Sequence, residues 1–220
     1  MKEEALNYEE LSKKLIPDNY KNVLAITPHG ELILMNTPEG RAYMALWGEV
    51  TIIDTEAELK NFRDEVNSGN TFAGKLVWLT SDINLNIGEE WEPIGKYFEE
   101  TGEVADPMNK PFMGVFDGGG HEINGVKIDS SDTGVGLFGL ARIATIMNLG
   151  LGSSCSISTT ETRVGGICGL AATGTNIINC YNKGSVVGYM YVGGITRASY
   201  RRRDCYVMYQ LRIDICYQRG

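Results

Sequence analysis

Short apolar runs alternate with glycine and asparagine between Gly134 and Thr196, and this alternation repeats. Val135-Gly-Leu-Phe-Gly139 is followed by Val164-Gly-Gly-Ile-Cys-Gly169 and then by Val192-Gly-Gly-Ile-Thr196. The second residue of each segment is a glycine, and these glycines are 29 and then 28 residues apart. A fixed period of about 20 to 50 residues is typical of stacked repeat units. The pattern therefore predicts a repeat protein, and by itself it indicates no catalytic or binding residues.

Each apolar run is predicted to be a short strand, because none is long enough for a helix or carries helical spacing. One such unit cannot bury its apolar face alone, so it must stack on a neighbour. Stacking about 4.8 Å apart pairs each strand with the one below, which predicts a parallel β-helix. We expect Asn148 and Asn179, which occupy equivalent places, to stack at a corner in the left-handed conformation. The residues expected to point inward are Ile146, Leu149, Leu151, Ile177 and Cys180.

These repeats resemble the GLUG-motif family, whose units read Gly-Leu-hydrophobic-Gly. The matches are Gly136-Leu-Phe-Gly139 and Gly166-Ile-Cys-Gly169, while Gly194-Ile-Thr196 departs at its last position. The upstream run Phe112-Met-Gly-Val-Phe-Asp-Gly-Gly-Gly-His-Glu-Ile123 is similar to a hallmark of the family, and Asn179-Cys-Tyr-Asn-Lys-Gly-Ser-Val186 is similar to its repeat ending.

The resemblance covers residues 52–196 and implies a right-handed parallel β-helix. Members of the family are mostly bacterial proteins that are secreted or attached to the cell surface, often within adhesins. The family has no general catalytic residues, so the resemblance transfers none to this chain.

Three segments follow from the chain's pattern. Residues 1–49 are predicted to form a small α+β lobe, with a helix over 3–16 and two hairpin strands within 22–35. Residues 50–196 are predicted to form the β-helix, and residues 197–220 an irregular basic tail. The tail holds six arginines and two aspartates and lacks the expected glycine corner, so we interpret it as an aberrant or truncated repeat.

A capping helix is predicted over residues 55–68. Thr55 and Glu58 have the spacing of a capping box, and Gly69 is the expected C-cap. We expect the helix to cover the first coil, because an open solenoid end is a template for aggregation. The apolar face of the helix consists of Leu59, Phe62 and Val66.

After this helix, strands are predicted at 75–80 and 83–85, with Trp91 pointing inward. Residues 96–110 form a polar excursion from the repeat. Long excursions from solenoids can carry a binding function, and a solvated insertion is the alternative. The next coil is predicted to bury Phe116, Ile123, Val126 and Ile128.

Composition narrows the classes of partner. The 27 glycines among 220 residues, about 12% against a usual ~7%, suit many tight corners. A net charge of −8 argues against nucleic acid or an anionic membrane as the partner. No apolar run is long enough to span a membrane. The N-terminal residues lack the pattern of a secretory signal, so we expect a fragment of a longer surface protein, the alternative being an intracellular chain.

Candidate reactive residues are few. The five cysteines include no Cys-x-x-Cys pair, and we expect Cys155, Cys168 and Cys180 to be buried fillers rather than disulfide or metal partners. Asp117-Gly-Gly-Gly-His121 could suggest a metal or catalytic site. We interpret it as a corner in which Asp117 caps backbone N–H groups and His121 is its hydrogen-bonding partner. His29 is predicted to be a solvated turn residue.

Two classes of function remain. The first is a non-catalytic structural or adhesive module of a bacterial surface protein, with a host protein or glycan as ligand. The alternative is a polysaccharide-acting lyase or glycoside hydrolase, which would need paired carboxylates. The candidate groups for that chemistry are Asp117, Glu122, Asp129, Asp132, Glu161, Arg142 and Arg163. We expect no two of the acids to share a face on adjacent coils, and therefore predict no catalytic, cofactor-binding or metal-binding residues.

Overall fold

The structure is a computed structural model that falls into two units, residues 1–46 and residues 47–220. It describes residues 50–86, 88–98 and 107–197, with short strands at 23–26, 32–34 and 207–208. In the first unit, β1 (Val23–Ile26) pairs antiparallel with β2 (Leu32–Leu34), as the predicted hairpin requires. The predicted helix over 3–16 and His29 lie outside the described residues.

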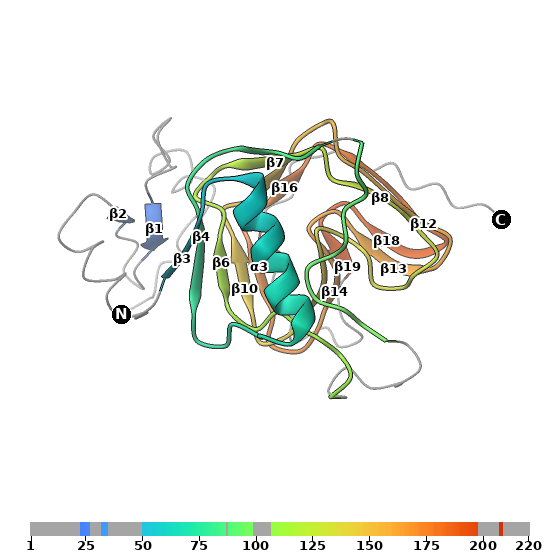
Figure 1. Ribbon diagram of the computed structural model, residues 1–220, viewed down its shortest axis with the longest axis horizontal. Helices are drawn as coiled ribbons and strands as arrows, with labels where there is room; N and C mark the ends of the chain where they lie inside the picture. Colours follow the sequence, from blue (N-terminus) through green and yellow to red (C-terminus); the bar gives the residue numbers. More distant parts are fainter. Residues whose placement is uncertain are drawn as a thin grey trace, which may run out of the picture. The chain divides into compact units, whose positions relative to one another are not determined.

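The second unit is a parallel β-solenoid (Figure 1). Its longest ladder has the strand order β20-β15-β10-β6-β4-β3, and neighbouring strands run parallel. Each strand comes from the next turn of the chain, so backbone N–H and C=O groups pair between turns. The strands are β3 (Val50–Ile53), β4 (Leu76–Leu79), β6 (Val115–Asp117), β10 (Thr145–Met147), β15 (Asn176–Ile178) and β20 (Val207–Met208).

Four further parallel ladders complete each turn. One holds β5 (Ile83–Asn84), β7 (Glu122–Asn124), β11 (Gly150–Leu151) and β16 (Tyr181–Asn182). The next holds β8 (Lys127–Ser130), β12 (Ser156–Thr159) and β17 (Ser185–Val187). The last two hold β13 (Thr162–Gly165) with β18 (Met190–Gly193), and β9 (Phe138–Ala141) with β14 (Cys168–Ala171) and β19 (Thr196–Arg197).

The three valine-glycine segments lie directly on one another. Val135 bridges Val164, and Val164 pairs with Val192, all in parallel register. The predicted period is therefore the stacking period of the solenoid, and the prediction of a mainly β, parallel β-helical fold is confirmed.

The predicted asparagine corner is present. Asn179 Nδ2 donates to Asn148 Oδ1 at 2.8 Å, and Asn148 Nδ2 donates to Asp117 Oδ1 at 3.0 Å. The two asparagines have φ values of 51° and 53°, in the left-handed region. A side-chain ladder thus runs through three successive turns at this corner.

One large apolar core fills the interior of the solenoid. All of the residues predicted to point inward are buried, including Trp91 and the residues of the coil around Phe116. Cys155, Cys168 and Cys180 are buried free thiols, as expected for apolar fillers. Burial raises the pKa of the Cys180 thiol to about 12, because a thiolate there would lose its hydration, and the nearby Asp117 carboxylate acts in the same direction.

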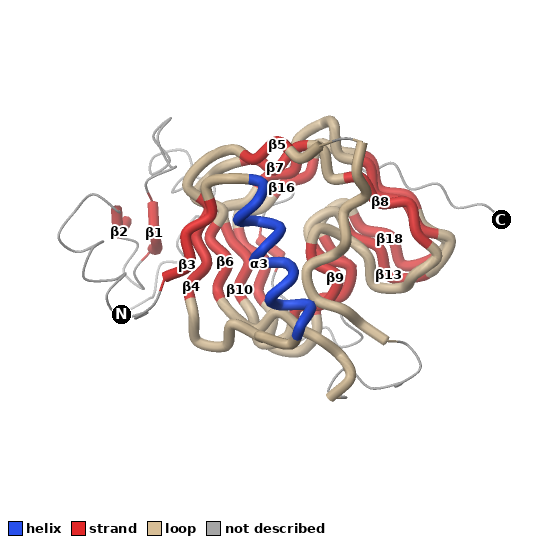
Figure 2. Tube along the Cα trace, viewed as in Figure 1, coloured by secondary structure: helices blue, strands red, loops and turns tan. Residues whose placement is uncertain are grey.

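The helix α3 (Glu56–Ser68) connects β3 to β4 and crosses the solenoid in Figure 2, where it is the one helix drawn among the described residues. The predicted capping box of Thr55 and Glu58 is formed, and Gly69 has a φ of 111° as the C-cap. Phe62 inserts among Phe72, Phe112 and Phe116, with ring centroids 5.0 to 5.7 Å away. The helix therefore covers the apolar interior where the first turns would otherwise leave it open.

The polar excursion begins and ends at an antiparallel bridge between Lys96 and Lys110, whose backbone groups exchange two hydrogen bonds of 2.9 Å. Residues 99–106 lie outside the described part of the chain. Tyr97, at the start of the excursion, packs against Leu140, Leu170 and Ala172, a small apolar cluster separate from the main core. The excursion is therefore anchored on the solenoid by its first residues.

Within the predicted basic tail, β20 pairs with β15 in the register Ile177 to Val207, so the main ladder gains a further strand. The neighbouring residues 198–206 and 209–220 lie outside the described residues. In the described part of the chain no helix is both long and apolar enough to cross a membrane.

Candidate functional site

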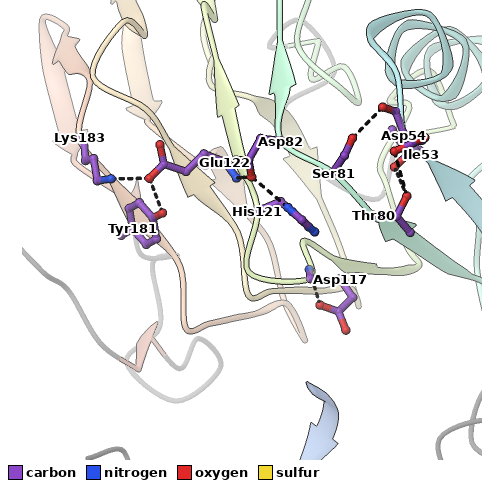
Figure 3. Close-up of polar contacts among 11 residues, drawn as sticks. Ile53, Asp54, Thr80, Ser81, Asp82, Asp117, His121, Glu122, Tyr181 and Lys183 are labelled. Carbon is purple, nitrogen blue, oxygen red and sulfur yellow. Dashed lines mark hydrogen bonds and ion pairs between the residues drawn. The ribbon is translucent and has the colours of Figure 1, made fainter. Parts of the chain in front are cut away.

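Five polar side chains from three turns meet along the ladder of β5, β7, β11 and β16, and we call them the polar flank: Asp82, His121, Glu122, Tyr181 and Lys183 (Figure 3). The parallel register places Glu122, Gly150 and Tyr181 in one column. Residues that are far apart in the sequence are thus brought together by the stacking of the turns.

Glu122 is the centre of the polar flank. Tyr181 lies two turns away, yet its hydroxyl donates to Glu122 Oε1 at 2.6 Å. Lys183 forms an ion pair with the same oxygen. The ion pair with Lys183, followed by the hydrogen bond from Tyr181, lowers the pKa of the Glu122 carboxyl below its usual value.

Gly150 makes this contact between non-adjacent turns sterically possible. A Cβ at Gly150 would overlap the ring of Tyr181, which lies across the bare backbone of β11. Gly152, in the same turn, likewise leaves room for the side chain of Asn124. Both glycines are therefore required by close approach of side chains from the turns on either side.

The second part of the polar flank is an acid–imidazole pair. Asp82 Oδ1 lies 2.9 Å from His121 Nδ1 and accepts the backbone N–H of Glu122 at 3.1 Å. The prediction that His121 would bond to Asp117 is wrong. The glycine corner turns the chain between those two residues, so that the imidazole reaches the preceding turn and Asp117 reaches the following one.

Asp117 is a corner residue, as predicted. It is 1% exposed, and its Oδ1 accepts the Gly119 N–H at 2.9 Å and Asn148 Nδ2 at 3.0 Å. Its Oδ2 is buried and has no hydrogen-bond partner in the described structure. Burial raises the pKa of the carboxyl to about 6, against the lowering effect of its two hydrogen bonds.

The remaining candidate groups lie apart from the polar flank. Ser158 donates to Asp129 at 2.8 Å, and Ser130 donates to Asp132 at 3.1 Å. Arg142 donates to the sulfur of Met113 at 3.8 Å. Among the described residues no three His, Cys, Asp or Glu side chains are grouped so that they could hold a metal ion.

One expectation about the acids is wrong. The constant register from Ser130 opposite Thr159 to Val135 opposite Val164 places Asp132 and Glu161 at equivalent positions of adjacent turns. The two acids are 29 residues apart, which is the repeat period. Both side chains are exposed. Adjacent acids on one face therefore do occur, close in sequence to Arg163.

A second surface follows the ladder of β13 and β18, and we call it the tyrosine–arginine column: Tyr97, Arg163 and Tyr191. Tyr97 lies against Gly134, and the Arg163 guanidinium carbon is 5.4 Å from the centroid of the Tyr97 ring. The register of β13 and β18 places Tyr191 directly on Arg163. The column thus brings a tyrosine of the excursion together with an arginine and a tyrosine at equivalent backbone positions of two turns.

Several of these residues carry no direct signal in the sequence. Asp82, Tyr181 and Lys183 stand in ordinary strand or turn positions, and their meeting depends on turns of unequal length. A signal was present in Gly150 and Gly152, because two glycines in an apolar run indicate close approach by other groups. For Arg163 and Tyr191, a bulky residue at the position where an earlier turn has Gly134 was the available sign.

Part of the chain matches a known protein family. Residues 160–187 match the model of the GLUG motif. No curated protein matches the chain, and no solved structure does. The matched residues span one turn of the solenoid, from the end of β12 to the end of β17. The chain is thus a GLUG-motif repeat protein, whose motif forms a turn of a parallel β-solenoid.

Proposed function

We propose that this chain is a non-catalytic binding module of a bacterial surface or secreted protein, which presents a flank of its β-helix to host proteins or glycans. The observation that carries the proposal is the contact of Tyr181 with Glu122 across the bare backbone at Gly150. It fixes hydroxyl, carboxylate and ammonium groups from separate turns in one arrangement. Fixed side chains lose little further entropy on binding, which favours affinity.

The charge of the chain fits this kind of ligand. A net charge of −8 disfavours polyanions, while the polar flank offers both signs of charge within one cluster. Mixed polar surfaces of this kind suit hydroxyl-rich or polar protein ligands, which are bound through hydrogen bonds. The module would act as one part of a larger protein that carries it at the cell surface.

An immobilised array of glycans and extracellular host proteins tests the proposal, with Lys183→Ala as the variant. Lys183 pairs with Glu122, whereas Lys127→Ala removes an exposed lysine from a different ladder and is the matched control. We expect the wild type and the control to bind a common ligand, and Lys183→Ala to bind it more weakly. Absence of binding to every glycan and protein would refute the proposal.

The alternative is a polysaccharide-acting enzyme, and the register of Asp132 and Glu161 is the observation in its favour. Glycoside hydrolysis needs two carboxylates roughly 5–10 Å apart across the scissile bond. A reducing-end assay on the polysaccharides of the same array distinguishes the two functions. Release of reducing ends that Glu161→Gln abolishes would establish the enzyme, and binding without release supports the module.

A further inference from the structure

Arg142 is a half-buried cation whose charge is not matched by an acid in the described part of the chain. Among the described residues, its guanidinium donates only to the sulfur of Met113, at 3.8 Å, and its Nε is buried with no hydrogen-bond partner. A thioether sulfur is a weak acceptor, and a cation that loses water without gaining an anion is destabilised. An anionic partner would stabilise such a guanidinium.

The surface around Arg142 is apolar and carries no acid of its own. Backbone hydrogen bonds hold the turns that pass this corner in register, at residues 71–75, 112–115, 141–145 and 172–176. None of these four segments contains an aspartate or a glutamate. Ile143, next to Arg142, is 62% exposed, and an exposed branched apolar side chain brings no stability to the isolated chain. We call Met113, Arg142 and Ile143 the arginine corner.

A second corner has the complementary composition. Asp132 and Glu161 are exposed at equivalent positions of adjacent turns, and neither forms an ion pair within the described residues. Two carboxylates at this spacing repel each other, and even with Arg163 nearby in sequence the local charge is negative. The next turn has Tyr189 at the same position, 69% exposed, followed by Met190, 43% exposed. We call Asp132, Glu161, Tyr189 and Met190 the acidic corner.

The fold itself does not require these exposed apolar side chains. At the position of Met190, the two preceding turns have Thr162 and Thr133, whose hydroxyl oxygens lie 3.0 Å apart. Ile143 likewise donates its backbone N–H to Thr173 of the next turn. Polar side chains therefore suit both places. Exposed methionine, tyrosine and isoleucine beside charged groups are instead typical of a surface that another protein covers.

We propose that this chain associates with further copies of itself, and that the arginine corner of one copy binds the acidic corner of the next. The guanidinium of Arg142 would lie between the carboxylates of Asp132 and Glu161 of the neighbouring copy, which relieves their mutual repulsion. Ile143 would pack on the ring of Tyr189. Both halves of the contact are present in one sequence, so a second copy supplies the cation, the anions and the apolar surface together.

The two corners of one copy lie apart, so each can bind a different neighbour. The arginine corner precedes β10, whereas the acidic corner lies at the start of β13 and β18, on another flank of the solenoid (Figure 1). A contact between two unlike surfaces continues from copy to copy and produces a row or a ring. The contact is smaller than a standard interface, so we expect a dissociation constant of about 10 µM to 1 mM. The inference is independent of the proposed ligand binding, because neither corner includes a residue of the polar flank.

The net charge of the chain opposes association at long range but not in contact. Copies with a net charge of −8 repel each other at a distance. Salt at physiological ionic strength screens exposed charges that are more than about 8 Å apart, while groups in direct contact are screened much less. Association therefore depends on the local charges of the two corners rather than on the charge of the whole chain.

Charge reversal tests the inference, with the full chain studied by sedimentation velocity at physiological ionic strength. Arg142→Glu makes both corners of a copy acidic, and Glu161→Arg makes both of them basic. Each variant alone should associate at least about tenfold more weakly than the wild type. An equal mixture of the two should associate as the wild type does, because each variant supplies the charge that the other has lost. Lys127→Glu, which makes the same change of charge outside both corners, is the matched control and should associate as the wild type does.

A further variant separates a lost contact from a lost fold. Ile143→Asn removes the exposed apolar side chain, and asparagine suits the φ of 50° at this position, so the variant should keep its melting temperature and still associate more weakly. If Arg142→Glu does not fold, Glu161→Arg and Ile143→Asn decide the question. A wild type that stays monomeric up to about 1 mM would overturn the inference. So would single variants that associate as strongly as the wild type, or a mixture of folded variants that does not restore association.

Discussion

Replacing Asp117 by asparagine tests the physical account of the corner. The Asp117 carboxyl is 1% exposed, and its pKa is raised from 3.8 to about 6 because burial removes the water that hydrates a carboxylate. At neutral pH the ionised Asp117 carboxylate therefore destabilises the folded protein. Asparagine has the same shape without the charge and can keep the acceptor that Gly119 and Asn148 use.

The magnitude follows from the shift in pKa. A rise of about two units corresponds to roughly 3 kcal/mol of destabilisation of the wild type above pH 6. Because the pKa is raised on folding, the native state binds the proton more tightly than the unfolded state does. The destabilisation by the ionised carboxylate is therefore absent at pH values below the pKa of the unfolded state. Wild-type stability should therefore fall between about pH 4 and pH 6 relative to the variant. The new amide NH₂ sits where Oδ2 had no partner, which costs about 1–3 kcal/mol at every pH.

The assay is urea unfolding of both proteins from pH 3.5 to pH 7.5, followed by tryptophan fluorescence, to which the buried Trp91 contributes. The informative quantity is how the difference in unfolding free energy between Asp117→Asn and the wild type changes with pH. The cost of the unpaired amide is the same at every pH, so it does not contribute to that change. We expect that difference to rise by about 3 kcal/mol in favour of the variant. Asp132→Asn, at an exposed carboxyl, is the control. A difference that stays flat for Asp117→Asn would refute the reasoning.

Three further predictions concern the polar flank and the cap. Gly150→Ala should lower stability by about 1–3 kcal/mol in thermal unfolding, because its methyl group would displace the Tyr181 ring; an unchanged melting temperature would contradict this. Phe62→Ala should cost about 3–5 kcal/mol in urea unfolding, since α3 covers the core largely through this ring; a loss under 1 kcal/mol would mean that the helix is dispensable. Lys183→Ala should raise the pKa of Glu122 in an NMR titration, as Lys183 is the main cause of its lowering; an unmoved midpoint would exclude the ion pair in solution.

Much of the fold could be predicted because the interior of a solenoid accepts only apolar residues at a constant period. Ile146 and Ile177 pair directly, as their spacing indicated, and Asn148 and Asn179 meet at the corner. The capping helix was also predictable, because a capping box and a C-terminal glycine are local signals. Each of these features depends on residues close in sequence or separated by one regular period.

The polar flank could not be predicted in the same way, because the early turns are unequal. Val50 pairs with Leu76 after 26 residues, whereas Leu76 pairs with Val115 after 39. The polar excursion lies within the longer turn, so no fixed period links Asp82 to His121. The contact of Tyr181 with Glu122 spans a whole intervening turn, whereas the repeat period relates residues of adjacent turns.

In a repeat protein, functional positions are hard to recognise because every turn has a similar sequence pattern. The informative residues are then those that break a backbone requirement which the other turns satisfy. A non-glycine residue in the left-handed region costs roughly 1–2 kcal/mol, except where asparagine compensates with local hydrogen bonds. Arg163 and Tyr191 accept that cost at a position where Gly134 avoids it. Such departures distinguish the side chains that this solenoid exposes at its surface from those that its backbone requires.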